Sequence, residues 1–185
     1  MTLRVRFGTA AVLFLVVATA HAAELRVTIV GNRDDSRVAA VREAMTFWNR
    51  ELRALGVQQR FGPIVFSDVP MPEGERALIA LRRVRGDVVI ALTHGEFASF
   101  TLPARGGEAA LIALRRGDVP PLSQPNVTRN VIAHELGHVL GLEHNADPAK
   151  LMCGRPAACR PDSFISSRPH FFALTNAEKG QLRKR

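Results

Sequence analysis

HELGHVLGLEH, residues 134–144, is the stretch around which this 185-residue chain is organised. His134 and His138 are four residues apart, so on a helix their side chains lie one turn apart on the same face. Zinc accepts three imidazoles as ligands and keeps a fourth position open for water. Glu135 directly follows the first histidine and is left free to transfer protons. We therefore expect His134, His138 and His144 to bind a metal, with Glu135 as the general base.

The residues between and before these histidines suit a helix that ends in a turn. Ile132, Leu136 and Val139 fall on roughly the opposite face, which can pack on a core. Gly141 comes one turn after His138, and glycine commonly ends helices in a left-handed conformation. The chain can reverse there and return the third histidine to the metal. A lone helical histidine is more often an ordinary surface or core residue, but the extended motif is much more specific than a bare HExxH.

This stretch resembles the signature of the metzincin metalloproteases, HExxHxxGxxH followed by a methionine-bearing turn. Residues 151–154, Leu-Met-Cys-Gly, stand where that turn is expected. The resemblance implies that Met152 packs beneath the metal, and an ordinary core methionine is the alternative. Residues 144–152 are most similar to the matrixin branch, although matrixins usually carry Ser or Thr where this chain has Asn145. The sequence contains no tyrosine, so the branches with a tyrosine ligand are not matched.

The resemblance implies an α+β zincin fold, with a twisted mixed sheet, an antiparallel edge strand, a long N-terminal helix and an active-site helix. It also implies Zn²⁺ as the cofactor and peptide-bond hydrolysis by zinc-activated water, with Glu135 as the base. A protein or peptide substrate would lie extended along the edge strand. Two alternatives stay open: a non-catalytic zinc-containing binding protein on the same fold, and a hydrolase of cell-envelope peptide cross-links. We expect a monomer.

The N-terminus reads as a secretory signal peptide. Arg4 and Arg6 precede an apolar run over residues 10–20, and Ala20-His21-Ala22 fits a cleavage site. The apolar run is too short for a comfortable membrane span, although an uncleaved anchor is the alternative. We expect a signal over residues 1–22 and a catalytic domain over residues 23–185. The mature protein is then secreted or periplasmic, without stable membrane insertion.

The composition is basic, with a formal net charge of +8. A basic surface can attract acidic partners such as anionic cell-surface polymers. No motif combines aromatic and basic residues as nucleic-acid binding requires, so we expect no nucleic-acid partner. A solvated, arginine-rich surface is the preferred interpretation.

Hydrophobic periodicity predicts the first half of the domain. Residues 24–30 alternate, which predicts a strand with one face on the core. Apolar residues at steps of three and four then predict a long helix ending at Gly56, with Trp48 in its core-facing stripe. We expect further elements over three ranges: a strand at 57–69 interrupted by Gly62-Pro63, a short helix at 75–84, and a buried strand at 88–93. A strand is the alternative over residues 75–84, and we prefer the helix because Ala, Leu and Arg favour it.

Two more strands are expected over residues 97–102 and 109–116. The first is our candidate for the substrate-binding edge, and the second is the alternative. Asn126 is the expected N-cap of the active-site helix. Thr175 and Glu178 form a capping-box pattern, which predicts a short C-terminal helix after an irregular segment.

Cys153 and Cys159 are the only cysteines. In an exported chain a disulfide between them is the natural reading, and a cysteine ligand that blocks the zinc is the alternative. Four apolar residues of the C-terminal region could line the pocket for a substrate side chain or fill space under a loop: Phe164, Ile165, Phe171 and Phe172.

Overall fold

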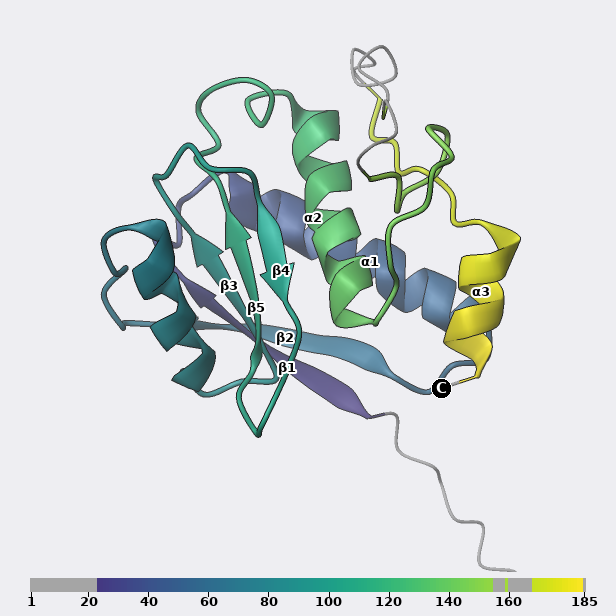
Figure 1. Ribbon diagram of the computed structural model, residues 1–185, viewed down its shortest axis with the longest axis horizontal. Helices are drawn as coiled ribbons and strands as arrows, with labels where there is room; N and C mark the ends of the chain where they lie inside the picture. Colours follow the sequence, from purple (N-terminus) through teal and green to yellow (C-terminus); the bar gives the residue numbers. More distant parts are fainter. Residues whose placement is uncertain (1–22, 155–158, 160–167, 185) are drawn as a thin grey trace, which may run out of the picture.

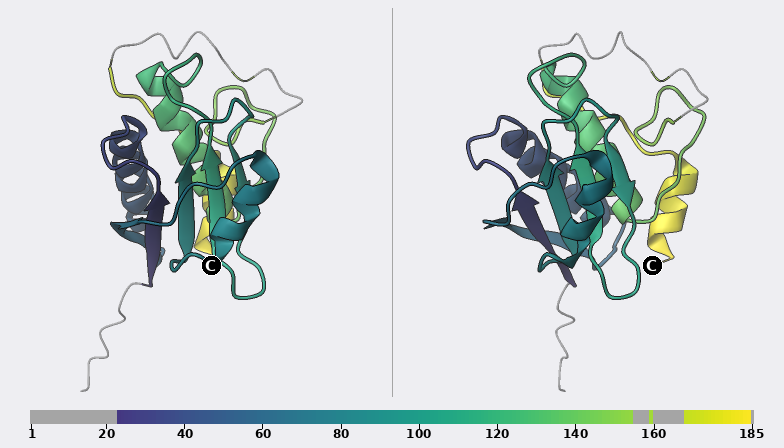
Figure 2. Two further views of the ribbon diagram at one scale, coloured as in Figure 1. Left: turned by 90° about the vertical axis from the view of Figure 1, so that its left-hand side faces the viewer. Right: turned by 60° about the vertical axis from the view of Figure 1, so that its left-hand side comes forward.

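The computed structural model describes residues 23–154, 159 and 168–184. The expected signal segment, Phe164 and Ile165 lie outside the described residues. Within them, helices α1 (Arg37–Ala54) and α2 (Pro125–Val139) cover one face of a five-stranded sheet, as Figures 1 and 2 show. A 3₁₀ helix, η1 (Glu75–Arg83), lies against the other face. The described part of the domain is therefore three layers thick.

The sheet is mixed, with strand order β2-β1-β3-β5-β4. Its first four members are parallel, and β4 pairs antiparallel with β5 at one edge. This confirms the predicted α+β fold with an antiparallel edge strand. The strands are β1 (Glu24–Val30), β2 (Arg60–Ser67), β3 (Val88–Leu92), β4 (Phe100–Leu102) and β5 (Ala110–Leu114).

The two candidates for the edge strand are now distinguished. The strand predicted over residues 97–102 is β4, shortened to three residues, and it is the edge. The strand predicted over 109–116 is β5, which is entirely buried between β3 and β4.

The strand predicted over residues 57–69 is β2, and it is also shorter than expected. Gly62-Pro63 lies inside β2 and does not break it. A register shift in the pairing of β1 with β2 accommodates these residues.

The expectation that only one face of β1 rests on a core is wrong. Val27 and Ile29 belong to the main core under α1 and α2, whereas Val30 on the other face joins a second cluster. Leu78 and Leu81 of η1 form that second cluster together with β3 and β5 residues. The short helix predicted over 75–84 covers the second face, so the central strands are buried on both sides.

Trp48 fixes the position of α2. Its side chain is completely buried, as expected for a core residue, and its indole Nε1 donates to the carbonyl of Ala133 in α2 over 2.8 Å. Helix α1 ends at Ala54, just before Gly56, the glycine at which its end was predicted and which has a left-handed φ of 74°. The long N-terminal helix therefore holds α2 by packing and by one buried hydrogen bond.

Helix α2 begins earlier than expected, and Asn126 is not its N-cap. Gln124 is the N-cap and Pro125 occupies the first turn, where a missing N–H costs nothing. The buried Asn126 instead donates to the carbonyl of Arg168 and accepts from the backbone of His170. It ties the start of α2 to the C-terminal segment.

The C-terminal helix α3 (Asn176–Arg183) carries the predicted capping box, in which Thr175 and Glu178 bond to each other's backbone N–H.

Among the described residues, no helix has both the length and the apolar character needed to cross a bilayer.

Candidate metal centre

The turn after α2 has the hydrogen bonds that the sequence predicts for a glycine terminus. Gly141 has φ 73°, its N–H donates to His138, and the N–H of Leu142 donates back to Gly137. This pair of bonds is a Schellman motif. It reverses the chain immediately after the second histidine, so that His144 returns toward the helix.

The structure brings the three predicted histidines to one point. The Nε2 atoms of His134, His138 and His144 lie 3.1 Å from one another in all three pairs. Tetrahedral bonds of about 2.0–2.1 Å to a zinc ion separate neighbouring ligand atoms by about 3.3 Å. Within the described residues, this is the one group of three or more potential ligands that could share a metal.

The hydrogen bonds of the rings show which nitrogens are free. The Nδ1 atoms of His134 and His138 each lie 2.8 Å from a backbone carbonyl, of Leu151 and Leu142 respectively. A carbonyl only accepts, so each Nδ1 carries the proton and each Nε2 presents a bare lone pair. Lone pairs that converge in this way repel one another unless a cation lies between them. The donor set therefore fits zinc.

Burial favours the neutral form of these rings. It lowers the pKa of His134 to about 4, helped by the neighbouring histidines and opposed by the bond to Leu151. Burial, followed by the effect of His138, also holds the pKa of His144 below its usual value. Neutral imidazole is the form that binds a metal, so no proton has to leave these two rings at neutral pH.

Glu135 lies beside the histidines but does not join them. Its side chain is 6% exposed, and burial raises the pKa of its carboxyl to about 7, against the opposing effect of a hydrogen bond from Thr101. The Thr101 hydroxyl, on strand β4, lies 2.7 Å from Oε2 of Glu135. A carboxyl group whose pKa is near the working pH is suited to accept and return a proton.

The turn that follows the third histidine packs closely against the site. The Met152 side chain is completely buried, and a Cβ placed on Gly137 would lie 2.4 Å from its sulfur. A Cβ on Gly154 would lie 2.2 Å from Cγ of His144. Met152 therefore lies directly against the active-site helix, and glycine at both positions permits this close packing.

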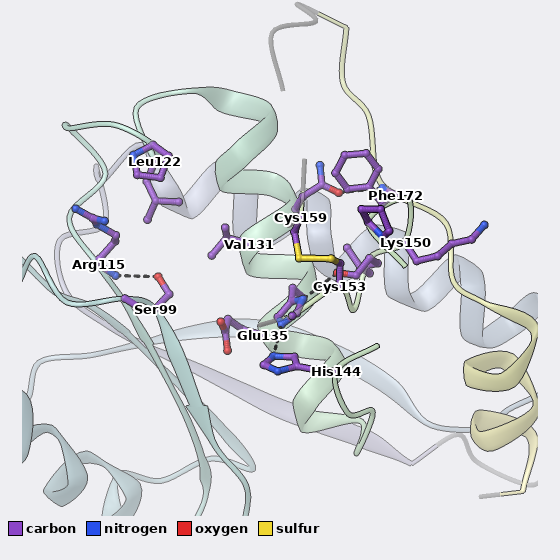
Figure 3. Close-up of a pocket in the computed structure, with 17 residues that line it drawn as sticks. Ser99, Arg115, Leu122, Val131, Glu135, His144, Lys150, Cys153, Cys159 and Phe172 are labelled. Atoms are coloured by element: carbon purple, nitrogen blue, oxygen red, sulfur yellow. Dashed lines mark hydrogen bonds between the residues drawn. A yellow bond between two sulfur atoms is a disulfide. The ribbon is translucent and has the colours of Figure 1, made fainter. Parts of the chain in front are cut away.

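Two cavities meet at the site. The disulfide-side cavity has a volume of about 480 Å³ and is bordered by Val131, Cys153, Cys159 and Phe172. Of the two neighbouring phenylalanines expected to line a pocket or fill space, Phe172 therefore lines the cavity and Phe171 packs against the core. Figure 3 shows Glu135 and His144 beneath the disulfide and Leu122 across the cavity from it. The turn-side cavity, of about 490 Å³, is bordered by Phe100, Thr101, His138 and Gly141. Ser99, Glu135 and His144 line both.

The two cysteines form the predicted disulfide, Cys153–Cys159. It forms part of the wall of the disulfide-side cavity, and its sulfurs are bonded to each other. Because both sulfurs are in the disulfide, neither cysteine is available as a metal ligand in this structure.

Comparison with known proteins identifies the family. The sequence profile of the matrixins matches residues 25–164. The chain belongs to the matrixin family. Matrix metalloproteinase-16 from Homo sapiens is 35% identical over 115 residues, a match that covers 54% of this chain and 18% of that protein. The protein of the same name from Mus musculus gives the same values. The chain thus spans less than a fifth of the length of these relatives.

Solved structures show the same fold at lower sequence identity. Archaemetzincin from Methanopyrus kandleri has a TM-score of 0.58 at 16% identity, over 91% of this chain and 97% of that one. Metalloproteinase-II from Bacteroides fragilis has a TM-score of 0.55 at 16% identity, over 89% of this chain and 53% of that one. These likenesses place the matrixin chain on the metzincin fold.

Asn145 stands where matrixins usually have Ser or Thr, and the structure gives it a function in packing. Its amide donates to Glu178 of α3 over 2.6 Å, and its backbone pairs with Met152 and Gly154. Gln181 of α3 also donates to the carbonyl of Gly141 over 2.7 Å. The C-terminal helix of this matrixin therefore holds both ends of the loop that carries the third histidine.

Two contacts of the site could not be found from the sequence. Thr101 lies 34 positions before Glu135, in a strand whose pairing is not encoded locally. The partner of Asn145 is 33 positions further along the chain. The alternation of Phe100, Thr101 and Leu102 was the available signal for the first, because it places the threonine on the opposite face from its neighbours.

Proposed function

We propose that this chain is a secreted or periplasmic zinc-dependent endopeptidase. In this proposal His134, His138 and His144 hold the zinc and Glu135 is the general base. The observation that carries it is the convergence of three Nε2 atoms, 3.1 Å apart, beside a buried carboxylate that is not part of the ligand set. Membership of a metalloprotease family supports the same assignment.

In this proposal the zinc ligands, the backbone carbonyls beside them and Glu135 have separate roles in hydrolysis. Bound zinc would polarise the substrate carbonyl and lower the pKa of water toward about 7. The carbonyls of Leu151 and Leu142 hold two of the imidazoles in the tautomer that binds metal. Glu135 takes the proton from water as it attacks the peptide carbonyl and then delivers it to the leaving amine. The scissile bond breaks between the carbonyl carbon and that amine.

A peptide substrate would lie extended along β4. That strand is at the edge of the sheet and has a neighbour on one side only, so its other side can pair with a further strand. The disulfide-side and turn-side cavities flank Glu135 and His144, and both reach Ser99 at the start of the edge strand. One chain pairing with β4 would therefore present side chains to both cavities and its backbone to the metal.

The proposed location rests on the disulfide and on the signal pattern over residues 1–22. Disulfides persist in oxidising compartments, and Cys153–Cys159 forms in this structure. We propose that the chain acts as a monomer, without nucleic acid and without stable membrane insertion. The formal net charge of +8 falls to +6 when Arg4 and Arg6 are removed with the signal, and we interpret the remaining basic residues as a solvated, arginine-rich surface.

Substitution of the proposed base is the direct test. Glu135→Gln keeps the size of the side chain but removes its ability to accept a proton, so peptide cleavage should fall by about three or more orders of magnitude while zinc remains bound. Zinc content and the turnover of a peptide library are the two measurements. Glu73→Gln, at an exposed position outside the cavities, is the matched control.

The same assay separates the alternatives. Near-wild-type turnover by Glu135→Gln would refute the assignment of the base. Zinc binding without chelator-sensitive cleavage of any peptide would indicate a binding protein. Cleavage of cell-envelope fragments alone would indicate a hydrolase of peptide cross-links.

A further inference from the structure

Glu135 has a single hydrogen-bonding partner for its carboxylate in the part of the chain that the structure describes. The Thr101 hydroxyl lies 2.7 Å from Oε2 and 3.1 Å from the backbone carbonyl of the same glutamate. One hydroxyl proton serves one strong bond, and the shorter distance assigns it to the carboxylate. The hydroxyl therefore bonds to the residue proposed as the general base.

The other carboxylate oxygen is left available. Among the described residues, Arg115 Nε is the one buried side-chain nitrogen or oxygen without a partner. Oε1 of Glu135 also has no bonded partner among those residues, but it is not a fully enclosed atom. Because Glu135 lines both cavities, this oxygen keeps some exposure to the cleft. The two oxygens thus have different environments, one bonded to the edge strand and one facing the space where water and substrate would lie.

The sheet gives Thr101 this position. Phe100 and Leu102 pack toward the second core cluster, on the side of η1, so the residue between them faces α2. Thr101 pairs with Ile112 of β5, a fully buried strand, which fixes the height of the hydroxyl relative to the helix. Since β4 has three residues, Thr101 is its only side chain on that face.

We propose that Thr101 is a positioning residue for hydrolysis. Its hydroxyl holds the Glu135 carboxylate in one orientation, with Oε1 directed to the attacking water, and it ties the base to the strand along which the substrate pairs. The threonine keeps its own proton throughout, and the proton from water goes to Glu135. The inference rests on the proposed function, because it requires Glu135 to be the base.

The geometry makes a specific kinetic prediction. If the hydroxyl only orients the base, its loss should slow turnover without weakening the binding of substrate or zinc. If the hydroxyl merely fastens β4 to α2, its loss should instead lower thermal stability and disturb KM and metal affinity together. Thr101→Val removes the hydroxyl at nearly constant volume, and Thr101→Ser keeps it.

Four proteins should be compared: the wild type, Thr101→Val, Thr101→Ser and Thr28→Val. Thr28 is the matched control, because its hydroxyl also makes a 2.7 Å bond in the same sheet, to the carbonyl of Arg85, away from the cavities. The measurements are kcat and KM on one cleaved peptide, zinc affinity by chelator competition, and thermal unfolding of the zinc-loaded chain.

We expect Thr101→Val to lower kcat by about 10- to 100-fold, with KM and zinc affinity within about threefold of wild type. Thr101→Ser should recover kcat to within about threefold, and Thr28→Val should leave it unchanged. A kcat for Thr101→Val within about threefold of wild type would overturn the inference. So would a serine variant as slow as the valine variant.

The failure of this inference can be told from the failure of the proposed function. Normal turnover by Glu135→Gln refutes both, whereas an inactive Glu135→Gln with a normal Thr101→Val refutes only the role of the threonine. If Thr101→Val loses zinc or fails to fold, Thr101→Ala is measured in its place. Loss of zinc by both variants would also overturn the inference, because the hydroxyl would then support the metal site and not the base.

Discussion

At the scale of single residues, the geometry of the site depends on two glycines as much as on its histidines. Gly137 and Gly154 face Met152 and His144 at distances that leave no room for a Cβ. His144 is the exposed member of the trio, and its ring packs on the backbone of Gly154. A side chain at that position would have to displace either the ring or the turn.

The prediction at this scale concerns Gly154→Ala. The added Cβ would lie 2.2 Å from Cγ of His144, so the third imidazole should move and zinc affinity should fall by about 10- to 100-fold. Chelator competition measures this affinity. Gly180→Ala is the matched control, because a Cβ there meets no atom within 4 Å. Equal zinc affinity in both variants would show that the packing of Gly154 does not constrain the ligand.

At the scale of elements, a buried arginine joins the strand ends near the cleft. Arg37, at the start of α1, is 2% exposed and donates to Asp35 and to the carbonyls of Thr93, Leu114 and Arg115. It therefore connects the first helix to the ends of β3 and β5. Removing the partner of a buried charge costs more than an exposed ion pair contributes.

The prediction for this ion pair is a pH-dependent stability. Burial alone would raise the pKa of Asp35, but the hydrogen bonds and charge of Arg37 outweigh it and hold the pKa below its usual value. The carboxylate therefore contributes stability that is fully present above its unfolded pKa and is lost as the pH falls through the folded one. Asp35→Ala should lower the free energy of unfolding by about 3 kcal/mol at pH 7, and by less near pH 3.

Urea unfolding at the two pH values measures this difference. Asp34→Ala is the control, since Asp34 is exposed and adjacent and, within the described residues, makes no hydrogen bond or ion pair with Arg37. A destabilisation by Asp35→Ala that is equal at both pH values would show that the ion pair is not the source of the effect.

The elements also show what the sequence could and could not predict. The metal motif lies within eleven residues, so helical periodicity and one glycine turn suffice to bring its three histidines together. The capping box at Thr175 and the end of α1 were similarly predictable from local patterns, whereas the edge strand was expected from the resemblance to metzincins, with two candidate strands. The start of α2 was misjudged because Asn126 resembles an N-cap but is used in a long-range contact. Thr101 reaches Glu135 only through strand pairing, which one sequence does not determine.

At the scale of the whole molecule, the disulfide joins the turn under the site to the chain that leads toward α3. Its loop is short, so loop entropy gives a stabilisation of about 2–3 kcal/mol. Cys153→Ser with Cys159→Ser should lower the free energy of unfolding by about that amount and leave one zinc bound per chain. Urea unfolding and metal analysis check both parts. If the double variant folded as well as the wild type but lost its zinc, a cysteine would have to be a metal ligand.

X-ray absorption at the zinc edge on the purified, active chain is the most direct test of the proposed centre. It should give one zinc per chain with three imidazole nitrogens at about 2.0–2.1 Å, a further light atom and no sulfur, and His144→Ala should remove one of the three. A sulfur neighbour, or a wild-type spectrum with fewer than three imidazoles, would refute the three-histidine centre on which the proposed chemistry depends.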